Sequence, residues 1–183
     1  MNMNEWAKEI HQNAVEHGWW EEERSFGDII ALCHSELSEA LEEYRNGWYS
    51  NKEIYVITNT QPICSRPFNT ETDSKLKPEG VPTELADCMI RILDYLGKMD
   101  CPVNAWMKQQ YINLKYKTFG DFIAVCHKYL SKSFEKESYP EMIKVIKMII
   151  EYCRKEDIDI EEAIRIKHEY NKTRPFRHGG KVI

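Results

Sequence analysis

The sequence predicts an all-α fold, a helical bundle of about seven helices built from a tandem, degenerate repeat. Apolar residues recur at helical spacing along most of the 183 residues, and only eight glycines and seven prolines interrupt them. The stretch SFGDIIALCHSELSEALEE at 25–43 returns at 118–136 with ten identities in nineteen positions. We therefore expect a single domain at 1–183, with repeat one at 19–117 and repeat two at 118–183.

Each helix is expected from its own run of apolar residues and from the signals at its ends. The second helix begins near Gly27-Asp28 and ends at Asn46-Gly47, a pair that suits a helix C-terminus. The third opens at Pro82-Thr83-Glu84 and gives way to a turn at 100–102. The expected helices cover 4–17, 27–46, 82–99, 103–116, 119–136, 140–155 and 159–172.

Residues 47–80 break the helical pattern and predict a long loop. They contain three prolines and many Asn and Thr residues. Within them the β-branched run EIYVIT at 53–58 favours a short strand or one arm of a β-hairpin. Long loops are more often functional than decorative, so a lid and a dimer contact are both open roles for this one.

Composition excludes several classes of function. The net charge of −5 argues against a general nucleic-acid binder, which carries a basic face. No window approaches the roughly 20 apolar residues of a membrane span, and the N-terminus has no apolar signal core, so we expect a cytoplasmic protein. The six cysteines form no C-x-x-C pair. Cys33 and Cys126 occupy equivalent positions of the two repeats and lie in apolar runs, so we expect them to be core thiols. This pattern argues against a zinc site.

Two pairs of acidic residues are candidates for a metal site, Glu36 with Glu39 and Glu84 with Asp87. The members of each pair are three residues apart in an expected helix, so they share one face. Four carboxylates on adjacent helices repel one another unless a cation lies among them. Oxygen ligands without His or Cys suit Mg²⁺, with Mn²⁺ as a substitute. The plain alternative is two solvated acidic faces, which explains most pairs of this kind.

The second copy keeps the apolar face of these helices and loses the acids. A site that is needed once can decay in a spare copy, whereas a purely structural helix has no reason to change in this way. A di-iron bundle would require Glu-x-x-His on two helices, and no Glu in this chain has a His three residues later. The aligned positions are Glu36 and Tyr129, Glu39 and Lys132, Glu84 and Glu141, and Asp87 and Lys144.

The C-terminal segment is basic and predicts a phosphate-binding region. Lys167, Asn171 and Arg174 fall at i, i+4 and i+7 of the last expected helix. Lys181 follows Gly179-Gly180, a pair whose backbone N–H groups can approach an anion closely. A disordered basic tail is the alternative. On the first interpretation, repeat one supplies the cation ligands and repeat two supplies the anion ligands.

With these residues in view, the chain resembles the MazG-like, all-α nucleoside triphosphate pyrophosphohydrolases. The resemblance covers 5–99 and 156–183, while 100–155 look like inserted material from a partial duplication. Its motifs are ELSE at 36–39, ELAD at 84–87 and the ending KHEYNKTRPFRHGGK at 167–181. It implies Mg²⁺-dependent hydrolysis of a nucleoside triphosphate to the monophosphate and pyrophosphate, a reaction of nucleotide-pool house-cleaning. It also implies a homodimer, or an internal repeat that stands in for part of one.

The resemblance gives the candidate residues their roles. Glu36 and Glu39 would be catalytic, with Glu39 the candidate base that acts through a water. Arg91 fits a phosphate contact or an ion pair with Asp87 or Asp94. The metal ligands would be Glu36, Glu39, Glu84 and Asp87, and the phosphate ligands Lys167, Asn171, Arg174 and Lys181. Candidates for contact with the base are Trp19, Trp20 and Phe26 by stacking and His11 by a polar contact, although core packing is the commoner role of such residues.

Two other functions remain open at the level of sequence. One is a non-catalytic nucleotide-binding or regulatory helical protein derived from the same family, which would bind a triphosphate without forming product. The other is a helical adaptor whose charged stripes contact protein partners without any need for magnesium. The enzyme is preferred because all four acids and the whole basic ending are present.

Overall fold

The computed structural model describes residues 1–48, 53–58, 61–67, 77–110, 112 and 115–182, and most of these residues are helical. The all-α fold class expected from the sequence is confirmed. None of the described helices is long and apolar enough to cross a membrane. The elements are α1 (Met3–Glu16), α2 (Phe26–Arg45), β1 (Glu53–Thr58), β2 (Gln61–Pro67), β3 (Lys77–Glu79), α3 (Val81–Lys98), α4 (Val103–Gln109), α5 (Phe119–Glu135), α6 (Pro140–Lys155), α7 (Ile160–Lys172) and the short turn α8 (Arg177–Gly180).

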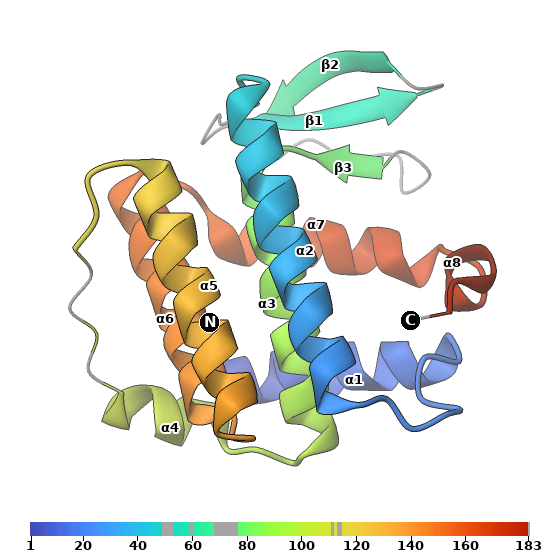
Figure 1. The fold of residues 1–183 in the computed structure, drawn as a ribbon. Helices are drawn as coiled ribbons and strands as arrows, with labels where there is room; N and C mark the ends of the chain where they lie inside the picture. Colours follow the sequence, from blue (N-terminus) through green and yellow to red (C-terminus); the bar gives the residue numbers. More distant parts are fainter. Residues whose placement is uncertain (49–52, 59–60, 68–76, 111, 113–114, 183) are drawn as a thin grey trace.

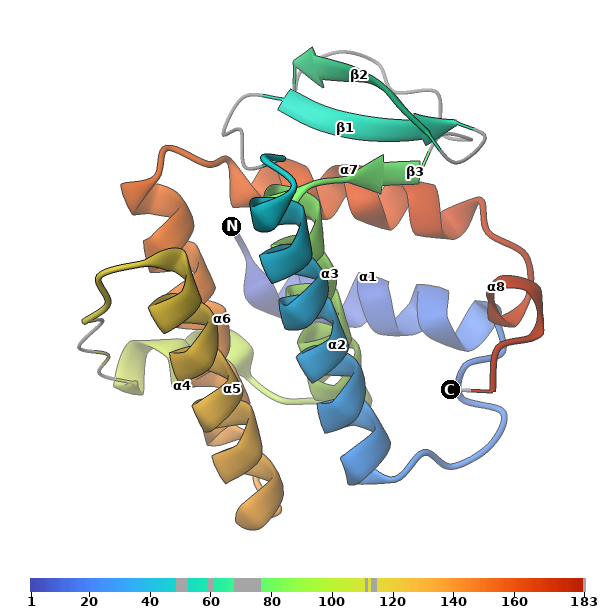
Figure 2. The ribbon, with the colours of Figure 1, turned by 45° about the horizontal axis from the view of Figure 1, so that its top comes forward.

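Two helical hairpins form the body of the molecule (Figure 1). One hairpin pairs α2 with α3, the other pairs α5 with α6, and α2 also packs along α5. On the other side of α3, α1 and α7 run across it, one beside the other (Figures 1 and 2). Helix α3 is therefore central, because it contacts α1, α2, α6 and α7.

The helices α2 and α5 begin with the same local structure. Ser25 and Asp28 form a capping box at the start of α2, in which each side chain bonds the other residue's backbone N–H. Thr118 and Asp121 form the same capping box at the start of α5. The stretches that are related in sequence thus start their helices at equivalent residues.

The hydrophobic core runs between the hairpins and continues under α1 and α7. The thiols of Cys33 and Cys126 lie in it, as expected, and the side chain of Cys64 falls outside the described residues. Helix α1 packs closely against α3 at Gly97, where a Cβ would lie 2.3 Å from the carbonyl oxygen of Ala7. Large side chains buried in the core include Leu37, Leu85, Met89, Leu93, Leu96, Phe122, Leu130 and Met142.

Part of the expected loop at 47–80 forms a small antiparallel sheet over one end of α2 and α3 (Figure 2). Its strand order is β2-β1-β3, and the register between β1 and β2 shifts at Val56/Ile57. The expected strand at 53–58 is β1, and it forms a hairpin with β2. Strand β3 leads directly into α3 through Gly80, whose φ of 105° is a conformation that favours glycine.

Helix α4 is shorter than the sequence predicts, and one residue that we placed on α7 lies beyond that helix. Helix α4 ends at Gln109, whereas the expected helix continued to 116. The ammonium of Lys147 donates to the backbone carbonyls of Met107 and Gln110, so carbonyls at the end of α4 find their partner on α6. Helix α7 ends at Lys172, as expected, so Arg174 lies beyond the helical stripe on which we placed it.

Candidate functional site

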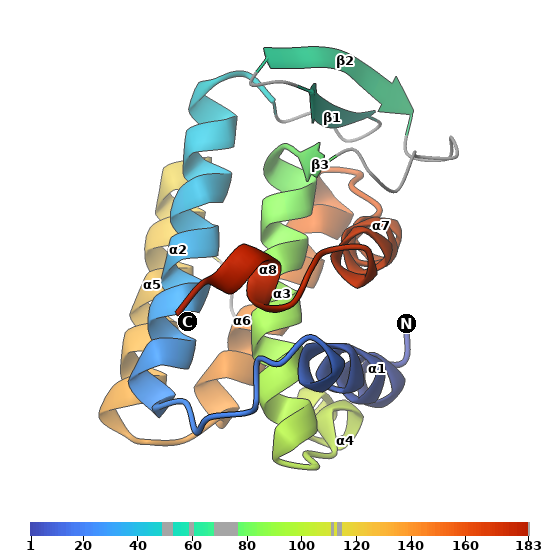
Figure 3. The ribbon, with the colours of Figure 1, turned by 90° about the vertical axis from the view of Figure 1, so that its right-hand side faces the viewer.

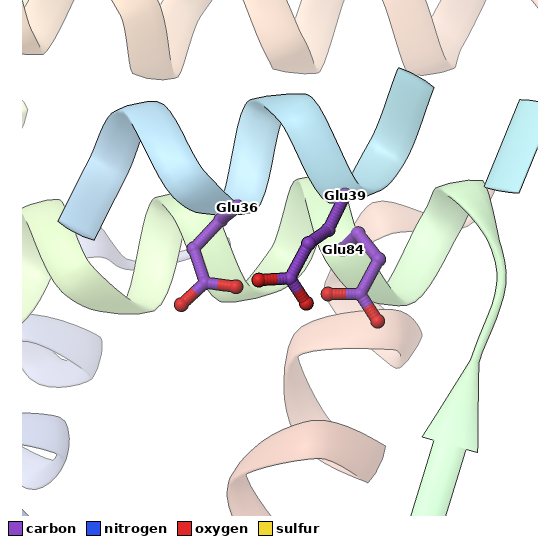
Figure 4. A group of neighbouring side chains, drawn as sticks. All are labelled: Glu36, Glu39 and Glu84. Atoms are coloured by element: carbon purple, nitrogen blue, oxygen red, sulfur yellow. The ribbon is translucent and has the colours of Figure 1, made fainter. Parts of the chain in front are cut away.

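Three carboxylates from α2 and α3 lie side by side on one face of the bundle (Figure 4). One carboxylate oxygen each from Glu36, Glu39 and Glu84 lies within 4.8 Å of the other two. Asp87 follows Glu84 by one turn of α3, and its charge raises the pKa of both Glu36 and Glu84. The fold therefore brings together the four acids that the sequence singles out.

The four acids differ in their contact with solvent. Glu36 is 6% exposed and Glu84 is 1% exposed, whereas Glu39 is exposed and accepts a hydrogen bond of 3.0 Å from the hydroxyl of Ser35. Burial raises the pKa of Glu36, and burial together with the charge of Asp87 raises the pKa of Glu84 to about 9. Burial raises the pKa of such carboxyls because removal from water disfavours their charged form.

Lys167 lies inside the acidic cluster and apart from the basic residues of the C-terminal tail. Its ammonium is 2.9 Å from Asp87 Oδ2 and 3.4 Å from Glu84 Oε1, and it donates to the carbonyl of Pro78 at 2.9 Å. Only 2% of the residue is exposed. Burial lowers the pKa of Lys167, but the carboxylates around it outweigh burial and raise the pKa above its ordinary value. We expected this lysine to bind phosphate, and the structure shows it as the counter-ion of the acids.

Glu79, on β3, is a fifth acid of the cluster that the sequence analysis did not identify. It is 5% exposed, forms a hydrogen bond with Glu84 and pairs with Lys77. Burial raises the pKa of Glu79, but the hydrogen bond from Glu84 and the two nearby lysines make the net shift a decrease. The protonated Glu84 therefore donates to the ionised Glu79.

Glu43 is a sixth acid at the edge of the cluster. It stands one turn after Glu39 on α2 and accepts a hydrogen bond from the backbone of Gly80. Burial and the charge of Glu79 raise its pKa to about 7. Its Oε2 atom is buried and has no hydrogen-bond partner within the described part of the chain. Glu43 could have been identified from the sequence, because its spacing from Glu36 and Glu39 places all three residues on one helical face.

Arg91 connects the acids to a group of basic side chains. Its Nε donates to Glu36 Oε1 at 3.0 Å, so its partner is neither Asp87 nor Asp94, the two residues expected from the sequence. Burial lowers the pKa of Arg91, and the charges of Glu36 and Asp87 outweigh burial and raise it. The guanidinium is thus held at the edge of the acidic cluster on α3.

The basic residues of the C-terminus border the same face. Burial lowers the pKa of Arg174, whose guanidinium also interacts with the charges of Asp87, Arg91 and Glu36. Burial and the charges of Arg174, Arg91 and Lys181 lower the pKa of His178 to about 3. Two of the four expected phosphate ligands, Arg174 and Lys181, therefore lie in one basic group. A third expected ligand, Asn171, is half-buried on α7, one turn after Lys167.

The C-terminal segment forms a left-handed turn, α8, which lies in front of α3 and between α2 and α7 (Figure 3). Arg177, His178, Gly179 and Gly180 have φ values of 43°, 50°, 92° and 88°, a conformation that is costly for the two residues with side chains. The N–H of Lys181 donates to the carbonyl of Arg177 at 2.9 Å. The N–H of Gly179 donates to the carbonyl of the residue just before the turn, at 3.0 Å, and is not directed at an anion as we expected.

The turn is anchored at the end of α1. The backbone N–H of Arg177 donates to the carbonyl of His17 at 3.0 Å, and its Nε donates to the carbonyl of Gly18 at 3.1 Å. The ring of Phe176 occupies the space beside Gly18, where a Cβ would lie 1.9 Å from a ring carbon. Contacts with α1 thus hold the tail in its strained conformation over the site.

An aromatic group lies at the other end of the same helix face. Asp94 accepts hydrogen bonds from Trp20 Nε1 and His11 Nδ1, each at 2.8 Å, and is 7% exposed. This carboxylate fixes the orientation of both rings, which the sequence suggested for contact with a base. The third stacking candidate, Phe26, packs against the ring of Tyr95, and that contact belongs to the core.

Arg24 joins the aromatic group to the basic tail. Its guanidinium lies over the rings of Trp19 and Trp20, 4.6 Å and 5.4 Å from their centroids. The ring of Trp19 also meets His178 edge to face, with centroids 5.0 Å apart. The Nη2 atom of Arg24 is buried and finds no hydrogen-bond acceptor among the residues that the structure describes. The sequence analysis did not select Arg24, and its position directly before the start of α2 was the signal that could have identified it.

The equivalent positions in repeat two are closed by lysines. The surviving acid, Glu141, pairs with Lys144 at 2.7 Å and with Lys136 at 2.8 Å. Tyr129 stands at the position of the first acid, and the ammonium groups of Lys132 and Lys144 lie 5.5 Å and 5.6 Å from its ring centroid. The second copy of the site is therefore neutralised by its own side chains.

No protein-family model, curated protein or solved structure matches the chain. Its function is therefore inferred from the geometry of the described residues. The main feature of that geometry is a cluster of acids, most of them buried, which borders a cluster of basic and aromatic side chains along α3.

Proposed function

We propose that the chain is a Mg²⁺-dependent nucleoside triphosphate pyrophosphohydrolase of the MazG-like kind. One observation carries the proposal: buried acids and a basic group lie next to each other on one face, and both reach Arg91. A triphosphate complexed with a divalent cation has the complementary pattern of charge. The acids come from repeat one, and the basic residues of the tail come from the end of repeat two, so the two repeats together form the site.

The acidic cluster fits Mg²⁺ by the chemistry of its donors. Glu36, Glu39, Glu84 and Asp87 offer oxygen ligands alone, which a hard cation prefers. Such an ion supplies two things when bound: it neutralises phosphate charge and lowers the pKa of a coordinated water. Proton release from Glu84 would accompany its arrival, since a coordinating carboxyl has to be ionised.

The other side chains would bind and orient the substrate. Arg174 and Lys181 can form charge-assisted hydrogen bonds with phosphate oxygens, and Arg91 stands between them and the acids. Trp20, already fixed by Asp94, presents a ring on which a base can stack, and His11, held by the same carboxylate, can make a polar contact with it. A nucleotide would then lie along α3, with its phosphates near Asp87 and its base toward Asp94.

Hydrolysis requires a base that reaches the attacking water. Glu39 suits this role because it is the exposed member of the acidic cluster and a hydrogen bond from Ser35 holds it. In the proposed reaction, a water oxygen bonds to the α-phosphorus and its proton passes to a carboxylate. The bond from that phosphorus to the bridging oxygen breaks, and pyrophosphate leaves.

A substrate screen tests the proposal. The purified chain, supplied with Mg²⁺ and a panel of canonical and modified nucleoside triphosphates, should form monophosphate and pyrophosphate, and EDTA should stop the reaction. Glu39→Gln should lower kcat by about 100-fold or more while the helical circular dichroism spectrum stays unchanged. Glu42→Gln is the matched control, because Glu42 is exposed on the same helix and pairs with Arg45. A folded and fully active Glu39→Gln variant would refute the role of this site.

A nucleotide-binding protein without catalysis is the second candidate function. The neutralised acid of repeat two favours it, since Glu141 shows that this chain tolerates a site closed by lysines. The two candidates separate in the same screen. Saturable binding of a triphosphate without any product would support the binding protein and exclude the enzyme.

A further inference from the structure

The position of Lys167 inside the acidic cluster raises the question of what a divalent cation would meet there. Its ammonium contacts Asp87 and Glu84 directly, and a third acceptor, the carbonyl of Pro78, completes its three donors. The side chain is 2% exposed, so it is a resident part of the cluster and not a surface residue that strays into it.

A divalent ion bound by the same carboxylates would lie close to this ammonium. Mg²⁺ binds oxygen at about 2.0–2.1 Å, which is shorter than either contact of Lys167 with the acids. Two cations that share the oxygens of Asp87 and Glu84 would repel strongly in a site with little water. The lysine and the ion therefore compete for these oxygens.

Repeat two supplies independent support for this competition. There, Lys144 and Lys136 neutralise Glu141, the acid equivalent to Glu84. Lys144 stands at the position equivalent to Asp87, so in that copy a lysine has replaced a metal ligand and permanently neutralises the remaining acid. In repeat one the lysine comes from a different helix, α7, on a long flexible stem that can move away.

We propose that Lys167 is a built-in counter-cation that a divalent ion displaces from Asp87 and Glu84. The inference rests on the proposed function, because it concerns the same acids. The freed ammonium then points from α7 toward the neighbouring phosphate-binding residues Arg174 and Asn171. Metal binding and phosphate binding become coupled, since the ion that displaces the lysine also releases a ligand for the anion.

A titration of the metal-free full chain with Mn²⁺ measures the competition directly. Electron paramagnetic resonance of the free ion monitors the binding. Lys167→Met removes the ammonium and keeps the apolar stem, so the Mn²⁺ dissociation constant should fall by about 10-fold or more. Lys172→Met is the matched control: it removes one positive charge from the same helix at an exposed residue that pairs with Glu169. Its Mn²⁺ affinity should stay close to that of the wild type. Unchanged or weaker Mn²⁺ binding by folded Lys167→Met would overturn the proposal.

A measurement on the wild-type chain covers the case in which Lys167→Met does not fold. Acetylation of lysines by an N-hydroxysuccinimide ester, read by mass spectrometry, reports which amines reach solvent. Without metal, Lys167 should be protected while Lys172 reacts. With saturating Mn²⁺, labelling of Lys167 should rise several-fold and that of Lys172 should stay constant. Equal protection of Lys167 with and without Mn²⁺ would also overturn the displacement.

The outcomes separate this inference from the proposed function. Displacement of Lys167 by Mn²⁺ without any hydrolysis of triphosphates would keep the inference and reject the enzyme. Hydrolysis with no change of Mn²⁺ affinity in Lys167→Met would keep the enzyme and reject the inference.

Discussion

His34 and His127 occupy equivalent positions of the two repeats, and their Nδ1 atoms meet at 2.6 Å where α2 packs against α5. The ring planes differ by 16° and the centroids are 4.9 Å apart, so the rings meet nitrogen to nitrogen and not face to face. Such a contact requires one proton between the two nitrogens. Protonation of both rings would place two N–H groups and two positive charges against each other.

The pair predicts a loss of stability in mild acid. Burial lowers the pKa of both rings, and His34 lowers that of His127 further. Because the folded pKa values lie below the ordinary 6.5, the unfolded chain takes up protons first as the pH falls. The contribution of the pair is complete above pH 6.5 and is lost below it, by up to about 1.4 kcal/mol per pH unit for each proton.

Urea unfolding between pH 8 and pH 5 measures this loss. The double variant His34→Gln/His127→Gln keeps polar side chains that do not titrate, so its free energy of unfolding should fall less steeply than that of the wild type. Other histidines, such as His168 with a pKa lowered to about 4 by burial, act equally in both proteins and cancel in the comparison. Parallel curves for the two proteins would show that the pair does not titrate in this range.

Gly97 predicts an unusual sign for a helical substitution. Alanine in place of glycine normally stabilises a helix by about 1 kcal/mol. At Gly97 a Cβ would lie 2.3 Å from the carbonyl oxygen of Ala7 and 2.7 Å from Cβ of His11, so α1 would have to move. We expect Gly97→Ala to lower the free energy of unfolding by about 1–3 kcal/mol. Gly120→Ala is the control, since the nearest atom to its Cβ would be 3.7 Å away, and it should be neutral or stabilising.

The features that the sequence predicted correctly depend on local interactions. The start of α2 near Gly27, the start of α5 at 119 and the apolar spacing along both helices depend on residues within one or two turns, so they can be recognised without a structure. The convergence of the four acids could also be predicted, because Glu-x-x-acid spacing aligns each pair on one face of its helix and the two helices form a hairpin.

The features that were missed depend on helices meeting far apart in the sequence. Lys167 pairs with Asp87 only because α7 crosses α3, and no spacing within α7 reveals that crossing. Glu79 joins the site from a short strand in a region without periodicity. Arg174 was expected on the helical stripe and lies beyond it, because α7 ends before Pro175.

Glu84 and Glu141 occupy equivalent positions and should respond to the same substitution with opposite signs. The pKa of Glu84, raised by burial to about 9, means that folding protonates this group at pH 8 and loses stability by doing so. The contribution is favourable below the ordinary pKa of 4.5 and is lost as the pH rises toward 9. Glu84→Gln does not titrate, and its amide can still donate to Glu79. In EDTA at pH 8 this variant should be about 1–3 kcal/mol more stable than the wild type.

Glu141→Gln should instead destabilise the chain. Burial raises the pKa of Glu141, but the hydrogen bonds from Lys136 and Lys144 outweigh burial and lower it. Its contribution is present above the ordinary pKa of 4.5 and is lost as the pH falls, so at pH 7 the substitution should cost about 1 kcal/mol. Thermal unfolding with and without Mg²⁺ gives a second readout. Mg²⁺ should stabilise the wild type and Glu141→Gln, and should not stabilise Glu84→Gln.

The docking of the C-terminal tail predicts that Gly18→Ala weakens substrate binding. A Cβ at Gly18 would lie 1.9 Å from the ring of Phe176, so the ring and the turn α8 behind it would have to leave the end of α1. Arg174 and Lys181 would then lose their fixed positions beside the acids. We expect KM for the triphosphate to rise by about 10-fold or more, as for the loss of one charge-assisted hydrogen bond. Mn²⁺ affinity should stay unchanged, because the acids on α2 and α3 are not touched.

Gly47→Ala separates the loss of docking from simple backbone strain. Gly47 and Gly18 have φ values of 84° and 77°, so alanine is similarly strained at both. No atom of the described residues lies within 4 Å of a Cβ at Gly47, so none of them is displaced there. Both variants should lose about 1 kcal/mol of stability, but only Gly18→Ala should raise KM and expose the segment after Pro175 to trypsin. A tail that stays protected in Gly18→Ala, or an equal rise of KM in both variants, would show that the contact with Phe176 does not position the basic residues.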